Sequence, residues 1–239
     1  AAAGGGALLV AGLGGIAAGG LAGGFSGLMI TRFRLPPFIA TLAMMQVASG
    51  LAYIIAQGRP IHEAPDALTV LGRGTDPLVG VPWAVWLMVA LYAAGHLMMT
   101  RTAVGGNREA ARLAGVRVGS VLLFAYALSG ALAGLGGVVM ASQLRSGAPT
   151  YGLMYELYVI AAVVVGGTSL SGGEGKVLGT LIGAFIIAVI QNGMNLTNVE
   201  SYTQKVVLGL VILGAVLLDR IRRRGSRAQA PGPRPLALD

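Results

Sequence analysis

The chain has 239 residues, of which 55% are hydrophobic and 11% are charged, and its formal net charge is +8. Because soluble domains carry about 25% charged residues, this composition excludes an ordinary soluble domain and predicts an integral membrane protein. The sequence has no cysteine, which excludes disulfides, thiol catalysis and cysteine-ligated metal sites. The basic residues lie mostly between apolar segments, so we interpret them as orientation signals and predict no nucleic-acid binding and no cofactor.

Seven apolar segments follow one another along the chain, separated by stretches that are polar or rich in glycine and proline. A helix needs about 20 mainly apolar residues to cross the hydrocarbon core of a lipid bilayer. We therefore predict an all-α, polytopic fold with about seven transmembrane or re-entrant helices in one membrane domain, residues 1–219. The segments are residues 8–30, 38–56, 82–99, 121–141, 153–165, 177–190 and 206–218.

Two polar stretches are predicted to form no regular structure. Residues 57–81, between the second and third segments, are rich in glycine and proline and are expected to be a loop. Residues 220–239 are basic and then proline-rich, which predicts a disordered tail.

Residues 100–120, between the third and fourth segments, are basic and too polar to cross a membrane. Asn107 is a suitable N-cap for a short helix over residues 108–113, and Gly115 is expected to stop it. Such a helix is either a solvated loop helix or a helix that docks into a groove of a soluble subunit. The residues alone do not decide between these two interpretations.

The basic residues are distributed unequally between the two sides of the predicted membrane domain. If the seven segments alternate in direction, thirteen of the 17 Lys and Arg residues fall on one side, and the other side holds Arg59, Arg73, Arg145 and Lys205. Cytoplasmic loops carry the excess of Lys and Arg. This bias predicts that residues 100–120, the glycine-rich stretch 166–175 and the C-terminus lie on the cytoplasmic side of the plasma (inner) membrane.

A glycine- and serine-rich break, which we call the glycine hinge (residues 166–175), separates the fifth and sixth segments. Irregular backbone at membrane depth must be buried in protein or face water. The hinge is therefore either a tight turn at a membrane face or a re-entrant loop. Its candidate residues are Gly166, Gly167, Ser171, Gly172, Gly173 and Gly175. The motif LSGGE inside it is like that of an ABC ATPase, but the chain lacks the phosphate-binding G-x-x-x-x-G-K-[ST] loop, so no ATP hydrolysis is predicted.

Several neutral polar residues lie within or next to the apolar segments. Hydroxyl-rich solutes need neutral hydrogen-bond donors and acceptors along their path, and polar contacts between helices need the same groups. Both explanations remain open for Gln46, Ser49, Gln191, Asn192 and Asn195. The two histidines, His62 and His96, do not have the spacing of a metal site.

Four stretches together resemble the permease subunit of ABC importers of the ribose/xylose/galactose type, in the branched binding-protein-dependent permease family. They are TRFRLPPFIATLAMM (31–45), GRPI (58–61), GGNREAARLAGVRV (105–118) and the long stretch from VVVGGTSLSGGEGK to GAVLLD (163–219). The last stretch matches the family most specifically in order and spacing.

The resemblance implies a subunit that imports a monosaccharide by alternating access and performs no catalysis itself. It also implies three partners, namely a cytoplasmic ABC ATPase, an extracytoplasmic sugar-binding protein and a second permease subunit, identical or different. By the same analogy, the ATPase would act on the segment 106–115, with Gly106, Asn107, Arg108, Glu109, Ala110, Ala111, Arg112 and Gly115 as the coupling residues.

The resemblance also shows two departures from the family. Family members usually have a longer N-terminal part, so we expect that the chain is truncated at its N-terminus. They also usually have more residues before Gly105, so we expect an internal deletion of about two helical turns there. A truncated, inactive permease is therefore one alternative to the importer. A secondary transporter of a small polar solute is another, although it would need ion-coupling carboxylates in the middle of an apolar segment.

Overall fold

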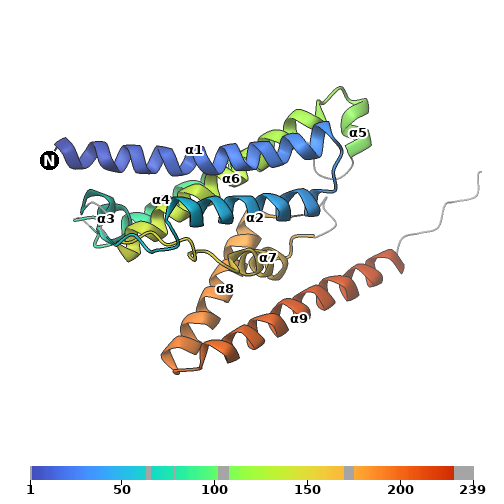
Figure 1. The fold of residues 1–239 in the computed structure, drawn as a ribbon. Helices are drawn as coiled ribbons and strands as arrows, with labels where there is room; N and C mark the ends of the chain where they lie inside the picture. The colour runs from blue at the N-terminus through green and yellow to red at the C-terminus, as the bar shows by residue number, and fades with distance from the viewer. Residues whose placement is uncertain (1, 63–65, 78, 102–107, 170–174, 229–239) are drawn as a thin grey trace, which may run out of the picture. The chain divides into compact units, whose positions relative to one another are not determined.

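The computed structural model describes residues 2–62, 66–77, 79–101, 108–169 and 175–228 (Figure 1). Over these residues the regular structure is helical, and two isolated antiparallel bridges join Ile61 to Gly147 and Thr75 to Pro82. The all-α prediction is confirmed. The helices are α1 (Ala2–Arg32), α2 (Pro37–Ile55), α3 (Asp66–Arg73), α4 (Trp83–Arg101), α5 (Arg108–Leu113), α6 (Val118–Leu144), α7 (Tyr155–Val165), α8 (Val177–Leu196) and α9 (Ser201–Ala228).

Each of the seven predicted apolar segments corresponds to an apolar helix. Four are long and apolar enough to cross a membrane: Val10–Arg32, Pro37–Ile55, Val118–Leu144 and Val177–Leu196. Three are shorter: Trp83–Met99, Tyr155–Val165 and Ser201–Leu217. Many large apolar side chains are exposed on these helices, which suits hydrocarbon surroundings and would be unfavourable in water. The prediction of a polytopic membrane protein is confirmed.

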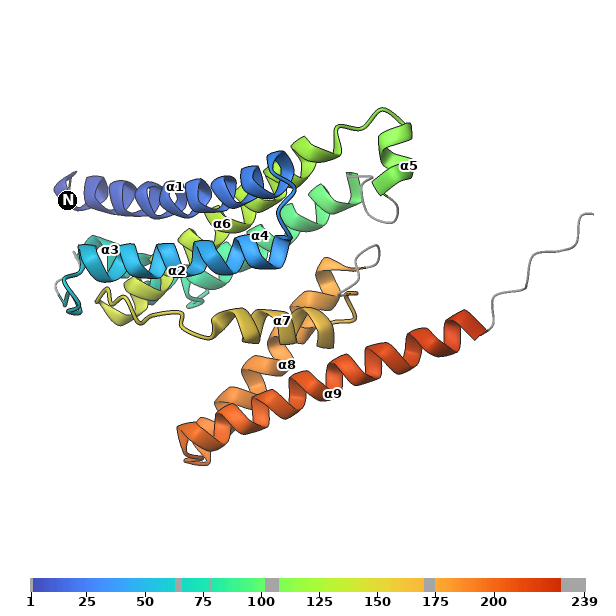
Figure 2. The ribbon, with the colours of Figure 1, turned by 45° about the vertical axis from the view of Figure 1, so that its right-hand side comes forward.

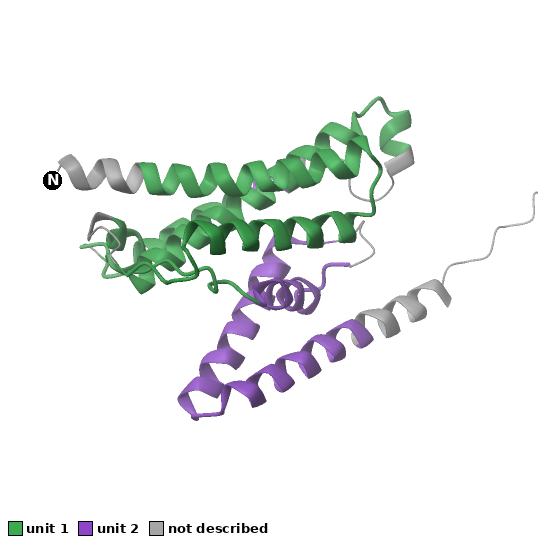
Figure 3. Ribbon diagram, in the orientation of Figure 1, with its two compact units in different colours: residues 1–94, 107–153 green, residues 95–106, 154–239 purple. Residues whose placement is uncertain are grey.

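The chain forms two compact units, coloured separately in Figure 3. Unit 1 comprises Ala1–Ala94 and Asn107–Leu153, and unit 2 comprises Gly95–Gly106 and Met154–Asp239. The boundary falls inside α4. We describe each unit by itself.

In unit 1, α1 packs against α6, which crosses it obliquely in Figures 1 and 2. Glycines repeat every fourth residue on the contacting face of α1. A Cβ atom added to Gly19 would overlap the carbonyl oxygen of Gly130, and one added to Gly23 would overlap that of Tyr126. Membrane helices approach this closely only where small residues line the contact. The glycines of α1 whose added Cβ would stand 3.0 Å or less from an atom of α6 are Gly15, Gly19, Gly23 and Gly27.

The prediction of an unstructured loop over residues 57–81 is wrong in part, because α3 forms within it. The hydroxyl of Ser142, at the end of α6, is fully buried and donates a hydrogen bond to the carbonyl of Leu68. It also accepts one from the backbone N–H of Gly72, at 2.7 Å. The guanidinium of Arg73 donates to the carbonyl of Gln143, at 2.7 Å. These contacts attach α3 to α6 from a sequence distance of about 70 residues, so local sequence patterns do not reveal them.

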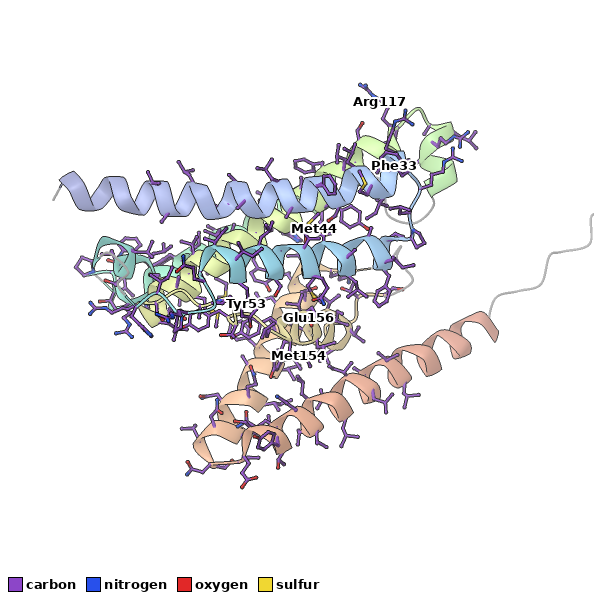
Figure 4. All side chains as sticks on the ribbon, in the orientation of Figure 1. Phe33, Met44, Tyr53, Arg117, Met154 and Glu156 are labelled. Atoms are coloured by element: carbon purple, nitrogen blue, oxygen red, sulfur yellow. The ribbon has the colours of Figure 1, made fainter. Side chains whose placement is uncertain are left out.

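The loops of unit 1 gather at two opposite ends. At the end that contains α3, Ile61 and Gly147 exchange two backbone hydrogen bonds of 2.8 Å, which join the loop after α2 to the loop after α6. The other end contains α5, the C-terminus of α1 and the N-terminus of α6, and Figure 4 labels Phe33 and Arg117 there. The end that contains α5 is the one for which the charge distribution predicts a cytoplasmic location.

In unit 2, α7 packs against both α8 and α9. The buried side chains Ala161, Ala162, Ile187 and Leu208 form its apolar core. Helix α9 continues to Ala228, so residues 220–228 of the expected disordered tail are helical. Composition alone predicts disorder in this segment. The segment is helical because it continues a helix that has already been nucleated, so each added helical residue costs little free energy.

Candidate functional site

The predicted short helix over residues 108–113 is confirmed as α5. Its end is a Schellman motif: the N–H of Val116 donates to the carbonyl of Ala111, and the N–H of Gly115 donates to that of Arg112, both at 3.0 Å. Gly115 has φ of +82°, a conformation that glycine adopts without strain. The prediction that Gly115 stops this helix is also confirmed. Gly106 and Asn107, and with them the predicted N-cap, lie outside the described residues.

Helix α5 has a buried side and an exposed side. Ala111 is buried, whereas Arg112 and Leu113 are exposed. Leu113 is 82% exposed. The structure therefore leaves the apolar side chain of Leu113 uncovered next to the exposed Arg112. An exposed leucine on a short polar helix is the feature expected of a docking element.

The connection between α5 and α6 is short and well bonded. Helix α5 ends at Leu113 and α6 begins at Val118. The N–H of Val118 donates to the carbonyl of Val116, at 2.9 Å, and that of Ser120 donates to the carbonyl of Arg117, at 3.0 Å. Because few residues separate the two helices, a displacement of α5 would act directly on the first turn of α6.

The described part of the glycine hinge begins with a second Schellman motif, at the end of α7. The N–H of Thr168 donates to the carbonyl of Val163, at 3.1 Å, and that of Gly167 donates to Val164, at 2.9 Å. Gly167 has φ of +84°. Gly175 lies against Thr168, since an added Cβ would stand 2.7 Å from its methyl carbon. The other hinge candidates, Ser171, Gly172 and Gly173, lie outside the described residues.

Two glycines that were not among the sequence candidates complete a close helix crossing beside the hinge. A Cβ atom on Gly166 would overlap the carbonyl oxygen of Gly179, and one on Gly183 would overlap that of Ala162. The four residues form two pairs with small-x-x-x-small spacing, Ala162 with Gly166 and Gly179 with Gly183. This spacing is the signal that could have identified them.

The polar candidates fall into two groups, one in each unit. On α2, Gln46 is exposed and Ser49 is half-buried. On α8, Gln191 is half-buried, while Asn192 and Asn195 are exposed. The side-chain oxygen of Asn195 accepts a hydrogen bond from Gln204 of α9, at 3.0 Å. This bond is a polar contact between helices, one of the two roles open for Asn195.

Among residues 2–62, 66–77, 79–101, 108–169 and 175–228, no group of three His, Asp or Glu residues is placed to hold a metal ion.

The chain matches the family model described as "Branched-chain amino acid transport system / permease component" over residues 1–216. The chain belongs to this permease family. The match extends from α1 through nearly all of the apolar part of α9, so it includes both units and all of the candidate residues. The recognition of a binding-protein-dependent permease from the four sequence stretches is confirmed.

Several proteins that are similar to this chain are named as sugar permeases. Ribose import permease protein RbsC of Haemophilus influenzae is 41% identical over 208 residues, which cover 83% of this chain and 64% of that protein. The protein of the same name from Escherichia coli is 42% identical, with coverages of 88% and 68%. The L-arabinose transport system permease protein AraH of E. coli is 38% identical, with coverages of 84% and 63%. The chain thus spans about two thirds of the length of these relatives. No solved structure matches it.

Proposed function

We propose that this chain is the transmembrane permease subunit of an ATP-driven importer of a monosaccharide of the ribose/arabinose class. The observation that carries the proposal is the similarity, at about 40% identity over more than four fifths of the chain, to permeases named for ribose and L-arabinose. The chain itself performs no covalent chemistry. Its task is to form part of a path that opens alternately to each side of the membrane.

Energy for this movement comes from a separate cytoplasmic ABC ATPase that docks on α5. Leu113 and Arg112 are exposed on that helix, and α6 begins within a few residues of its end. Helices α1 and α6 touch backbone to backbone through glycines, so they move as one body. Closure of the ATPase therefore tilts this helix pair, with residues 106–115 as the coupling segment.

The opposite end of unit 1 faces the exterior and receives a sugar-binding protein. The loops there are held together by α3, by the buried hydroxyl of Ser142 and by the bridge between Ile61 and Gly147. A second permease subunit, identical or different, completes the path, and Gln46, Ser49, Gln191 and Asn192 are the candidates for lining it. With this orientation the C-terminus lies in the cytoplasm, because thirteen of the 17 Lys and Arg residues then lie on the cytoplasmic side.

The function is tested by reconstituting the chain in vesicles with its ATPase and with candidate sugar-binding proteins. We expect ATP-dependent uptake of labelled ribose, arabinose, xylose or galactose that requires all components. Uptake driven by a proton gradient without the ATPase would instead identify a secondary transporter. Binding of the ATPase without uptake of any sugar would identify an inactive permease.

Coupling through α5 is tested with Leu113→Glu, which places a charge on the exposed position. The charge must be desolvated at the docking surface, so we expect ATPase binding to fall at least about tenfold. Thermal stability should stay within about 0.5 kcal/mol, because the side chain is exposed. Leu113→Met is the matched control and should bind normally. Unchanged binding by Leu113→Glu would exclude α5 as the docking element.

A further inference from the structure

Helix α2 carries a polar row on one side, which we call the polar stripe: Gln46, Ser49, Gly50 and Tyr53. Steps of three and four residues keep these positions on one side of the helix. Gln46, Gly50 and Tyr53 are exposed, and Ser49 is half-buried. Within the described part of the chain, the side chains of Gln46 and Tyr53 make no hydrogen bond. Thr41, the other polar residue of α2, bonds to carbonyls of its own helix.

The polar stripe lies away from the packed side of α2. Met44 is half-buried, and Tyr53 follows it by nine residues, which is about two and a half helical turns. Figure 4 labels the two residues on opposite sides of α2. Val47 and Ile54 lie on a neighbouring side, where they are 54% and 73% exposed and suit contact with lipid. Hydrocarbon offers no partner to the amide of Gln46, so the polar stripe requires polar surroundings.

We propose that the polar stripe is a contact site for the monosaccharide on its way across the membrane. The proposal rests on the function proposed above. Gln46 is the middle residue of the 19-residue helix Pro37–Ile55, so it lies near the middle of the membrane, a depth at which transporters bind substrates. Its amide and the hydroxyl of Ser49 are neutral donors and acceptors, which suit the hydroxyl groups of a sugar.

Gly50 leaves space beside these polar groups. An added Cβ at this position would meet nothing within 4 Å. Long side chains of a helix point back towards its N-terminus, so the ring of Tyr53, one turn later, borders this space. An aromatic ring offers an apolar face to the C–H groups of a sugar. The sugar ring therefore lies against Tyr53, and its hydroxyl groups reach Ser49 and Gln46.

The polar stripe ends at Gln46. Leu42 and Ile39, four and seven residues earlier, continue the same side of the helix and are 39% and 61% exposed. Apolar side chains offer no hydrogen bond to a hydroxyl-rich solute and favour the exclusion of water from a narrow path. The sugar therefore contacts α2 in the half that leads from Gln46 towards the C-terminus of the helix.

Single cysteines test whether the polar stripe meets water, because the chain has no cysteine of its own. The full chain is placed in lipid nanodiscs with any ATPase subunit that co-purifies, and a negatively charged methanethiosulfonate reagent is added. Ser49→Cys and Gly50→Cys should react at least about tenfold faster than the controls Val47→Cys and Ile54→Cys, because the charged reagent does not enter hydrocarbon.

Protection by sugar tests whether the polar stripe is a binding site. D-Ribose, L-arabinose, D-xylose and D-galactose are compared with sorbitol at the same osmolarity. At ten times its Kd, one of the four sugars should slow the reaction of both cysteines about tenfold, since about one site in ten then stays empty. Sorbitol should not slow it.

The role of Tyr53 is tested in the Gly50→Cys background. Tyr53→Leu removes the aromatic face and should raise the sugar concentration that gives half-protection about tenfold, whereas Tyr53→Phe should keep it within about twofold. Ile54→Leu, on the lipid-facing side, is the control and should leave this concentration unchanged. Equal shifts for Tyr53→Leu and Ile54→Leu would overturn the assignment of Tyr53.

Two results would overturn the site as a whole. Equal reaction at the polar stripe and at Val47→Cys and Ile54→Cys would mean that the stripe faces lipid or another helix. Fast reaction without protection by any of the four sugars would mean a water path without a sugar site.

The labelling needs no ATP hydrolysis, so the site and the proposed function can fail separately. ATP-driven uptake of a sugar that gives no protection would retain the function and exclude the site. Protection without ATP-driven uptake would support the site and contradict the importer.

Discussion

Helices touch backbone to backbone in both units, but over different lengths. On α1 the contacting glycines run from Gly15 to Gly27, about 18 Å of helix. In unit 2 the glycines that bring α7 and α8 backbone to backbone, Gly166, Gly179 and Gly183, lie at the end of α7 and in the first turns of α8, and on α8 they cover only about 6 Å of helix. A long backbone contact between two helices resists changes in their angle more than a short one does. We therefore interpret α1 and α6 as a rigid pair and the α7–α8 crossing as a pivot.

The largest effect is expected from breaking the rigid pair with Gly19→Leu. A side chain there would meet the backbone of Gly130, which cannot move aside without separating the helices. The free energy of unfolding should fall by at least about 3 kcal/mol, measured by reversible denaturation in detergent.

The matched control for this substitution is Gly14→Leu on the same helix, where an added Cβ meets nothing within 4 Å. It should leave the stability unchanged or raise it slightly, because leucine favours a helix more than glycine does. Equal destabilisation by both substitutions would contradict the packing of α1 on α6.

Breaking the pivot with Gly183→Leu should cost somewhat less stability, about 2–3 kcal/mol, and should abolish transport. The substitution forces α8 away from the backbone of Ala162 and Gly166. Gly193→Leu is the control, because an added Cβ at this position of α8 meets nothing within 4 Å. It should retain both the stability and the transport activity.

A disulfide reports whether the rigid pair survives when the pivot is broken. The chain has no cysteine of its own, and a Cβ at position 24 would stand 3.8 Å from that of Ala127, a suitable separation for a disulfide. Gly24→Cys with Ala127→Cys should therefore cross-link as well in the Gly183→Leu background as without it. Loss of the cross-link there would mean that the two crossings are not independent.

The contrast between the crossings also shows how far the sequence could predict this structure. Apolar segments near the length of a membrane span identified the seven apolar helices of the described part of the chain, and Gly115 marked the end of α5, because both signals are local. The sequence could not tell which of the many glycines of α1 meet another helix. Gly15 does, whereas its neighbour Gly14 has open space. Helix α3 was missed because Ser142 stabilises it from the end of α6.

A smaller effect is expected from Ser142→Ala, which frees α3 from the end of the rigid pair. The carbonyl of Leu68 and the N–H of Gly72 would lose the hydrogen bonds that both make with the hydroxyl of Ser142, a fully buried residue. We expect a loss of about 1.5 kcal/mol. Ser120→Ala, at an exposed position in the first turn of α6, is the control and should stay within about 0.5 kcal/mol. Similar losses for both variants would show that α3 is not held by the serine.

Effects of about the same size are expected at the two Schellman motifs, one in each unit. Gly115 and Gly167 have φ of +82° and +84°, and an added Cβ meets nothing within 4 Å at either position. Alanine at either site should therefore cost about 1–2 kcal/mol from backbone strain alone. Asparagine, which tolerates this conformation better, should cost less at both sites. Equal costs for the alanine and asparagine variants would mean that the backbone there is not held at positive φ.

Measurements of ATPase stimulation and of transport should distinguish the alanine variants of Gly115 and Gly167 even where their stabilities are equal. Gly115 directs the chain from α5 into α6, so its alanine variant should weaken stimulation of the ATPase by the permease. Gly167 begins the hinge after α7, so its alanine variant should slow transport and leave binding of the ATPase unchanged. If both variants lowered ATPase binding equally, coupling would not be confined to α5, and the division into a driven rigid pair and a passive pivot would fail.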